Sequence, residues 1–167
     1  MTLVPFDEGA QDEALPKVLD LLCAVPIFDG LKVEELTVIA KHMNYYEVGG
    51  GDVLFVEGER GHYVCFVVEG ELEVSKASAS GTRTVLTRLS RGQSIGEMAV
   101  VDEAPRSATV TALTPSRLLT FSRSDFETLL AEHPALGIRI LKGIARVLSQ
   151  YLRHASGQLA DRVLPIV

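Results

Sequence analysis

The chain lacks tryptophan, has only two cysteines, Cys23 and Cys65, and contains no long hydrophobic run. The cysteines form no CxxC pair and the four histidines show no HxH or HExxH spacing, so we expect no metal site and no cofactor. No apolar stretch approaches the roughly 18 residues that a membrane span requires. The N-terminal segment is acidic and lacks the basic and then apolar order of a secretory signal. These absences predict a cytoplasmic protein that has no membrane partner.

The composition that remains is typical of a folded globular domain. The 167 residues are 47% hydrophobic and 23% charged, with a formal net charge of −6. Basic residues form no compact cluster with interleaved aromatic side chains, which argues against binding to nucleic acid. Cys65 lies in the apolar run YVCFVV, and we predict that it is a small buried hydrophobic residue.

Hydrophobic periodicity divides the chain into three zones. Residues 15–43 have apolar positions at helical spacing, and Pro26 and Gly30 split this zone into two short helices. Residues 44–121 consist of short β-rich runs separated by glycines, a pattern typical of a small barrel or jelly roll.

The third zone is helical again. Ser122 or Ser124 can cap a helix over DFETLL, because a serine oxygen accepts from the free N–H groups of the first turn. A long helix is expected from about Pro134, since proline suits the first helical position, and Gly157 is the expected C-terminal stop.

The long helix carries a narrow apolar seam. Its members recur at alternating intervals of three and four residues: Leu141, Ile144, Leu148, Tyr151 and Ala155. A seam of this width packs either on the barrel of its own chain or against a second copy, which would form a homodimer.

One stretch of the β-rich zone holds an acid and an arginine among small and apolar residues. It reads Gly96-Glu97-Met98-Ala99 and, after a short interval, Pro105-Arg106-Ser107-Ala108. This stretch resembles the phosphate-binding cassette of cyclic nucleotide-binding domains. The runs PIFDGL, VEELTVIAKHM and GDVLFVEGERGHYVCFVVEGELEV resemble the N-terminal helices and glycine-punctuated early strands of the same family.

The resemblance covers residues 20–155 and implies a fold that is mainly β with flanking α. We expect a β-roll or jelly-roll barrel (a double-stranded β-helix) with short N-terminal helices and a long C-terminal helix. We expect an N-terminal extension with the start of a helix at 1–19 and the cyclic nucleotide-binding domain at 20–155. Within the domain, the N-terminal helices are expected at 20–43, the β-roll at 44–121 and the C-terminal helices at 122–155. A C-terminal tail is expected at 156–167.

The chemistry of the cassette suits a cyclic nucleotide. Arg106 offers a planar, permanently charged fork to the phosphate. MAVVDE is expected to form a helical turn whose N–H groups, that of Ala99 included, favour the anion, and Ser107 can donate to it as well. Glu97 would repel a phosphate, so we assign its carboxylate to the ribose 2′-hydroxyl. Gly96 and Ala108 are small and let the backbone approach the ligand, and we expect Gly96 at the ribose and Ala108 at the phosphate.

The alternative for Glu97 and Arg106 is that they pair with each other and close a loop.

The resemblance also implies pocket-wall positions at Val74, Leu86 and Leu89. It places Tyr151 and Leu152 where the long helix meets the base of the nucleotide. Tyr151 would either stack on the base or pack within the seam. By the same resemblance, Ser107 favours cAMP over cGMP as the ligand.

We therefore expect a regulatory sensor that transmits cyclic nucleotide binding through its C-terminal helix to a separate protein effector. Residues 156–167 are too few for a helix-turn-helix, so no direct DNA binding is expected. An enzyme would need a nucleophile–base set or a metal constellation, and the sequence shows neither, so no catalytic residue is assigned. The remaining alternative is a dimerising interaction module that has lost its ligand.

Overall fold

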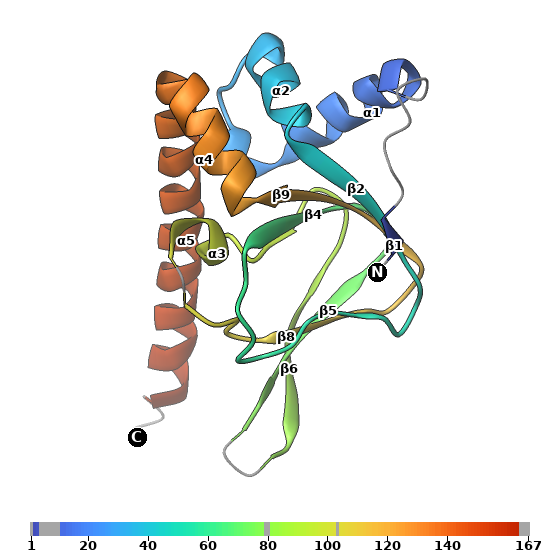
Figure 1. Cartoon of the computed structure of the whole chain (residues 1–167). Helices are drawn as coiled ribbons and strands as arrows, with labels where there is room; N and C mark the ends of the chain where they lie inside the picture. Colours follow the sequence, from blue (N-terminus) through green and yellow to red (C-terminus); the bar gives the residue numbers. More distant parts are fainter. Residues whose placement is uncertain (1, 4–10, 79–80, 103, 164–167) are drawn as a thin grey trace.

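A computed structural model describes residues 2–3, 11–78, 81–102 and 104–163; parts of the predicted terminal segments 1–19 and 156–167 lie outside these residues. Two β-sheets form a roll, three helices cover one end of it, and the long helix α5 runs along its side (Figure 1). The β5–β6 hairpin extends from the opposite end of the roll (Figure 1). This arrangement confirms the predicted fold, mainly β with flanking helices.

The strands of both sheets pair antiparallel within the described ranges. The first sheet contains, in spatial order, β1 (Thr2–Leu3), β2 (Met43–Val48), β9 (Ser116–Ser122), β4 (Tyr63–Glu69) and β7 (Ser94–Ile95). The second sheet contains, in spatial order, β3 (Val53–Phe55), β8 (Thr109–Ala112), β5 (Leu72–Ala77) and β6 (Arg83–Leu89). The short strand β1 was not predicted, because two residues are too few for a periodic signal.

Helices precede and follow the roll, and one lies within it. Their bounds are Gln11–Ala24 (α1), Pro26–Phe28 (the 3-10 helix η1), Val33–Ala40 (α2), Met98–Val101 (α3), Arg123–Glu132 (α4) and Pro134–Val163 (α5). The helical turn predicted in MAVVDE is therefore α3. The cap of α4 is Ser122, whose Oγ accepts from the N–H of Asp125 at 3.0 Å, as one of the two predicted alternatives required.

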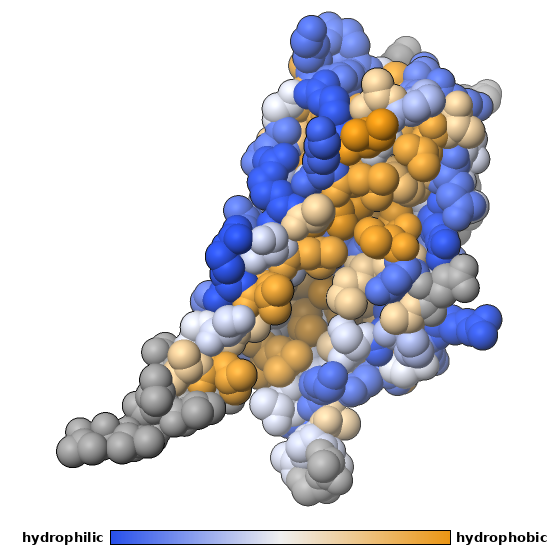
Figure 2. All heavy atoms as spheres, turned by 90° about the vertical axis from the view of Figure 1, so that its left-hand side faces the viewer, coloured by the Kyte–Doolittle hydropathy of each residue, from blue (hydrophilic) through white to orange (hydrophobic). Residues whose placement is uncertain are grey.

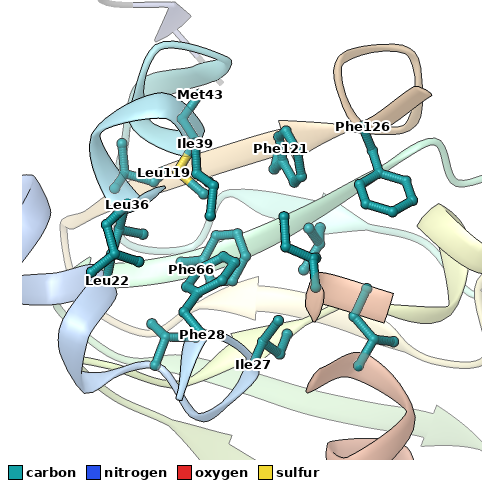
Figure 3. Close-up of a cluster of buried hydrophobic side chains, with 14 of the residues drawn as sticks. Leu22, Ile27, Phe28, Leu36, Ile39, Met43, Phe66, Leu119, Phe121 and Phe126 are labelled. Atoms are coloured by element: carbon teal, nitrogen blue, oxygen red, sulfur yellow. The ribbon is translucent and has the colours of Figure 1, made fainter. Parts of the chain in front are cut away.

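The first sheet is covered on both faces, which explains why strand β4 reads as a continuous apolar run. Successive side chains of a strand point to opposite faces. Val64 and Phe66 pack with the helices, whereas Cys65 and Val67 face the interior of the roll. Figure 3 shows the helix-side cluster, in which Phe66 lies beside Phe28 with ring centroids 5.4 Å apart. Cys65 is fully buried, as predicted.

Helix α5 begins at Pro134 as predicted, but the predicted stop at Gly157 is wrong because the helix continues to Val163. A single glycine costs a helix only about 1 kcal/mol, and the next strong helix breaker in the sequence is Pro165. Within the described ranges, no helix is long and apolar enough to cross a bilayer.

The structure divides the predicted seam of α5. Ile144 is 4% exposed and belongs to the helix-side cluster of its own chain, with Leu141 and Leu148 partly buried at the border of that cluster. Tyr151 and Ala155 are exposed. The prediction that Ile144 lies in a contact with a second copy is therefore wrong, because that residue is already buried in its own chain.

Two glycines of α5 provide a matched test of this packing. A Cβ at Gly143 would overlap the backbone oxygen of Ile27, whereas a Cβ at Gly157 would meet nothing within 4 Å. We expect Gly143→Ala to lower the free energy of unfolding by about 1–3 kcal/mol, although alanine favours helices. Gly157→Ala should raise it by about 0.5–1 kcal/mol. Urea denaturation of both variants measures this; equal effects would contradict the close contact between α5 and η1.

Candidate nucleotide-binding site

A cavity of about 170 Å³ opens between α3, the segment 104–108 and α5. Pockets that enclose a whole small molecule are roughly 300–1,000 Å³, so this cavity holds only part of a nucleotide-sized ligand. The residues that line it are Phe55, Ile95, Gly96, Glu97, Met98, Ala99, Ala104, Pro105, Arg106, Ser107, Ala108, Val110, Leu148 and Tyr151. The predicted cassette thus forms most of the wall.

The backbone of Arg106 is fixed by the loop that joins β3 to β4. Its N–H donates to the oxygen of Glu59 at 2.7 Å, and its own oxygen accepts from the N–H of Gly58 at 2.9 Å. An isolated antiparallel bridge joins Arg60 to Pro105 beside these bonds. Two backbone bonds on one residue leave little freedom at its Cα, so the side chain leaves the chain in a defined direction.

The guanidinium of Arg106 is buried, and no carboxylate of the described residues pairs with it. Its Nη2 donates to the backbone oxygen of Tyr63 at 2.8 Å, whereas its Nη1 is buried and has no hydrogen-bond partner among the described residues. Burial lowers the pKa of this guanidinium, but an arginine stays protonated at neutral pH. The site therefore holds a positive charge with a free donor.

Glu97 is 3% exposed, and its Oε1 accepts from the Oγ of Ser94 at 2.5 Å. Among the described residues, the carboxylate and the guanidinium of Arg106 have these different partners, with no ion pair between them. The alternative in which the two side chains only close a loop on each other therefore does not describe this structure. Glu97 and Arg106 thus line one cavity, and each is held by a partner other than the other.

The predicted small residues line the same cavity, but one predicted donor is occupied. The N–H of Ala99 donates to the oxygen of Gly96 at 3.0 Å, so it is not free to reach an anion in this structure. Gly96 has a φ of 89°, a left-handed conformation that favours glycine. Among the described groups, the Ser107 hydroxyl and the N–H of Ala108 donate to no acceptor, and both residues line the cavity.

The predicted wall residues lie elsewhere. Val74 and Leu89 are buried in the cluster between the two sheets, and the side chain of Leu86 is 55% exposed on β6. None of the three lines the cavity.

Of the two residues predicted near the base, Tyr151 lines the cavity and is half exposed, whereas Leu152 is 68% exposed and does not line it. Burial, and then the charge of Glu97, raise the pKa of Tyr151.

Three residues that contact Glu97 or Arg106 were not predicted from the sequence. Phe55 and Tyr63 lie against the guanidinium of Arg106, and Ser94 binds the carboxylate of Glu97. Each belongs to a strand whose pattern is explained by packing alone, so no local signal sets it apart. In the described part of the chain, no three histidine, cysteine or acidic side chains gather as metal ligands.

The fold and the cassette agree with the comparisons to known proteins. The family model of the cyclic nucleotide-binding domain matches residues 47–133, more than half of the chain. The chain belongs to this family. The match includes both Glu97 and Arg106 and the strands that position them.

Two curated relatives and one solved structure illustrate the similarity. A CRP-like cAMP-activated global transcriptional regulator of Mycobacterium tuberculosis is 24% identical over 86% of this chain and 62% of its own length. A cAMP-dependent protein kinase regulatory subunit of Mycosarcoma maydis is 36% identical over 70% of this chain and 23% of its own. A cyclic nucleotide-binding domain from Methylobacillus flagellatus has a TM-score of 0.79 at 28% identity, covering 93% of this chain and 85% of that one. The chain thus spans less than two thirds of either curated relative.

Cys65 beneath the site provides a test of burial through pH. Desolvation raises the pKa of its thiol from 9.0 to about 12. The unfolded chain loses this proton first, so the contribution of Cys65 to stability is complete below about pH 9 and is lost as pH rises toward 12. We expect the difference in unfolding free energy between wild type and Cys65→Ala to shrink by about 1.4 kcal/mol per pH unit in this window, measured by urea denaturation. A constant difference would contradict the burial of the thiol.

Proposed function

We propose that the chain binds a cyclic nucleoside monophosphate, cAMP in preference to cGMP, and transmits binding through α5 to a separate protein effector. The observation that carries this proposal is the buried Nη1 of Arg106, which has no partner among the described residues. A buried charged donor without an acceptor is costly unless a ligand supplies one. A phosphate monoanion supplies both the acceptor and the opposite charge.

The ribose is assigned to Glu97. One carboxylate oxygen binds Ser94, which leaves the other for a donor in the cavity. A sugar hydroxyl is such a donor, whereas a phosphate oxygen is not. The ribose would then separate the Glu97 carboxylate from the phosphate that Arg106 binds. The predicted roles of Ser107 and Ala108 in phosphate binding rest on their free donors at the same wall.

The base is assigned to the mouth of the cavity, beneath α5. The cavity is smaller than pockets that enclose a whole small molecule, and Leu148 and Tyr151 of α5 line it. A base at this position can stack on the ring of Tyr151, which contributes about 1–3 kcal/mol in comparable cases. Ligand contact with α5 gives the helix a means to favour one packing over another, which is the link to an effector.

Two further observations support this proposal. The two relatives named above are described as cAMP-activated and cAMP-dependent, which supports the choice of ligand. The alternative, an interaction module that has lost its ligand, does not account for a buried cation that pairs with no carboxylate among the described residues. Loss of ligand binding would remove any need for a charge that is expensive to bury.

Calorimetric titration with cAMP tests the phosphate assignment. Arg106→Ala should lower the affinity by at least about 2 kcal/mol, because the buried anion loses its charged partner. Arg88→Ala is the control, since Arg88 makes a surface ion pair with Glu73 at 3.7 Å and does not line the cavity. Equal affinities of wild type and Arg106→Ala would remove the assignment.

The ribose assignment has its own test. Glu97→Gln should lower the affinity for cAMP by about 1–2 kcal/mol, the strength of one hydrogen bond to a charged group. The same substitution should leave the affinity for 2′-deoxy-cAMP almost unchanged, because that ligand lacks the hydroxyl. An equal loss for the two ligands, measured by the same titration, would show that Glu97 does not bind the 2′-hydroxyl.

We also propose that α5 forms a homodimer, through a face adjacent to the predicted seam. Exposed apolar side chains recur every seven residues at Ile138, Ala145, Leu152 and Leu159, with Leu141 and Leu148 between them. This is the repeat of a two-stranded coiled coil. Figure 2 shows that apolar atoms form a band along this side of the molecule. From Gln150 to Ala160 every residue of the helix is exposed, so its own chain does not cover this end.

Substitution in the middle of this face tests the homodimer. Leu152→Glu should convert the dimer to a monomer, because it introduces two like charges into an apolar contact, whereas Gln150→Glu on another face of α5 should not. Sedimentation equilibrium measures the mass of each variant. A monomeric wild-type protein, or a dimer that survives Leu152→Glu, would contradict this contact.

A further inference from the structure

We propose that the aromatic pair, Phe55 of β3 and Tyr63 of β4, holds the guanidinium of Arg106 in its binding position before any ligand arrives. This inference rests on the proposed function, since it concerns how the phosphate anchor is prepared. Phe55 and Tyr63 act through Arg106 and are positioning residues.

The Phe55 ring makes the closest of these contacts. The Cζ of Arg106 lies 3.6 Å from the centroid of Phe55 and 4.9 Å from that of Tyr63. Both distances are within the range of about 6 Å in which a cation is attracted to the face of a ring. Phe55 is only 3% exposed, so water competes little with this attraction.

The aromatic pair is itself fixed. The two rings pack edge to face with centroids 5.3 Å apart, and the hydroxyl of Tyr63 donates to the oxygen of Leu54 at 3.3 Å. The backbone oxygen of Tyr63 accepts from Nη2 of Arg106. One residue therefore contributes both a ring and a hydrogen-bond acceptor to the same guanidinium, which restricts its rotation as well as its position.

Two glycines complete the space around the guanidinium. A Cβ at Gly61 would lie 2.5 Å from Nε of Arg106, and a Cβ at Gly96 would overlap Nη1. Gly61 does not have a left-handed φ, so an alanine there adds a methyl group without backbone strain. Its small size is explained by the arginine beside it.

The consequence is preorganisation. A free arginine side chain loses rotamer entropy when it is immobilised by a ligand, and this loss reduces affinity. With Nη2 bound and the ring of Phe55 against the guanidinium, most of that ordering is complete in the ligand-free protein. Nη1 is left as the group for the anion.

Three variants test the inference: Phe55→Leu removes the ring, Gly61→Ala intrudes on the guanidinium, and Phe126→Leu is a control in α4. Phe126 is equally buried and packs on Phe121, in the cluster that does not contain Phe55. The first measurement is ¹⁵N NMR of the Arg106 side chain in the ligand-free protein. The second is the affinity for cAMP, with the urea midpoint of each variant measured alongside.

In the wild type, Arg106 should show separate Nη resonances from slow rotation, unlike the exposed Arg60. Phe55→Leu and Gly61→Ala should average these resonances and lower the affinity for cAMP by about 3- to 30-fold. Phe126→Leu should lower the urea midpoint but leave both readouts unchanged. If Phe55→Leu does not fold, Gly61→Ala still gives both readouts.

Averaged Arg106 resonances in the wild type would overturn the inference, as would unchanged affinity in both site variants. A wild-type protein that shows slow rotation but binds no cyclic nucleotide would instead refute the proposed function. The NMR measurement needs no ligand, so the two failures are distinguishable.

Discussion

The structure depends on one constraint: a permanently charged guanidinium is buried beside aromatic rings, and one of its donors has no partner within the described ranges. The buried position is maintained because the Arg106 backbone is bonded to the β3–β4 loop, its Nη2 to Tyr63, and its Cζ lies over Phe55. These contacts offset part of the desolvation of the charge, but none neutralises it. The other residues of the site surround this positive charge, and an anionic ligand would neutralise it.

The rest of the fold supplies rigidity to this point. The first sheet is packed on both faces, so the strand that carries Tyr63 and Cys65 cannot shift without disturbing two clusters of buried side chains. Helix α5 is anchored at its first half, where Gly143 lies against η1, and its exposed second half begins beside the cavity. The proposed link to an effector rests on this arrangement, in which the helix is fixed at one end and lines the cavity in its middle.

The sequence predicted the β-roll and the pair Glu97 and Arg106, because glycine spacing and a charged pair in an apolar run are local signals. It did not predict Phe55 as a contact of Arg106, because a buried aromatic residue in a strand has the same pattern whether it packs on leucine or on arginine. The implied wall positions Val74 and Leu89 are buried between the sheets, away from the cavity lining. The end of α5 was placed too early because one glycine is a weak stop signal in a strongly periodic helix.

The most direct test is an experimental structure of the protein with cAMP. Our account predicts that a phosphate oxygen lies about 2.7–2.9 Å from Nη1 of Arg106, the length of a charge-assisted hydrogen bond, and that the 2′-hydroxyl lies at the Glu97 carboxylate. A complex in which the phosphate binds elsewhere, with Nη1 still unpaired, would contradict it.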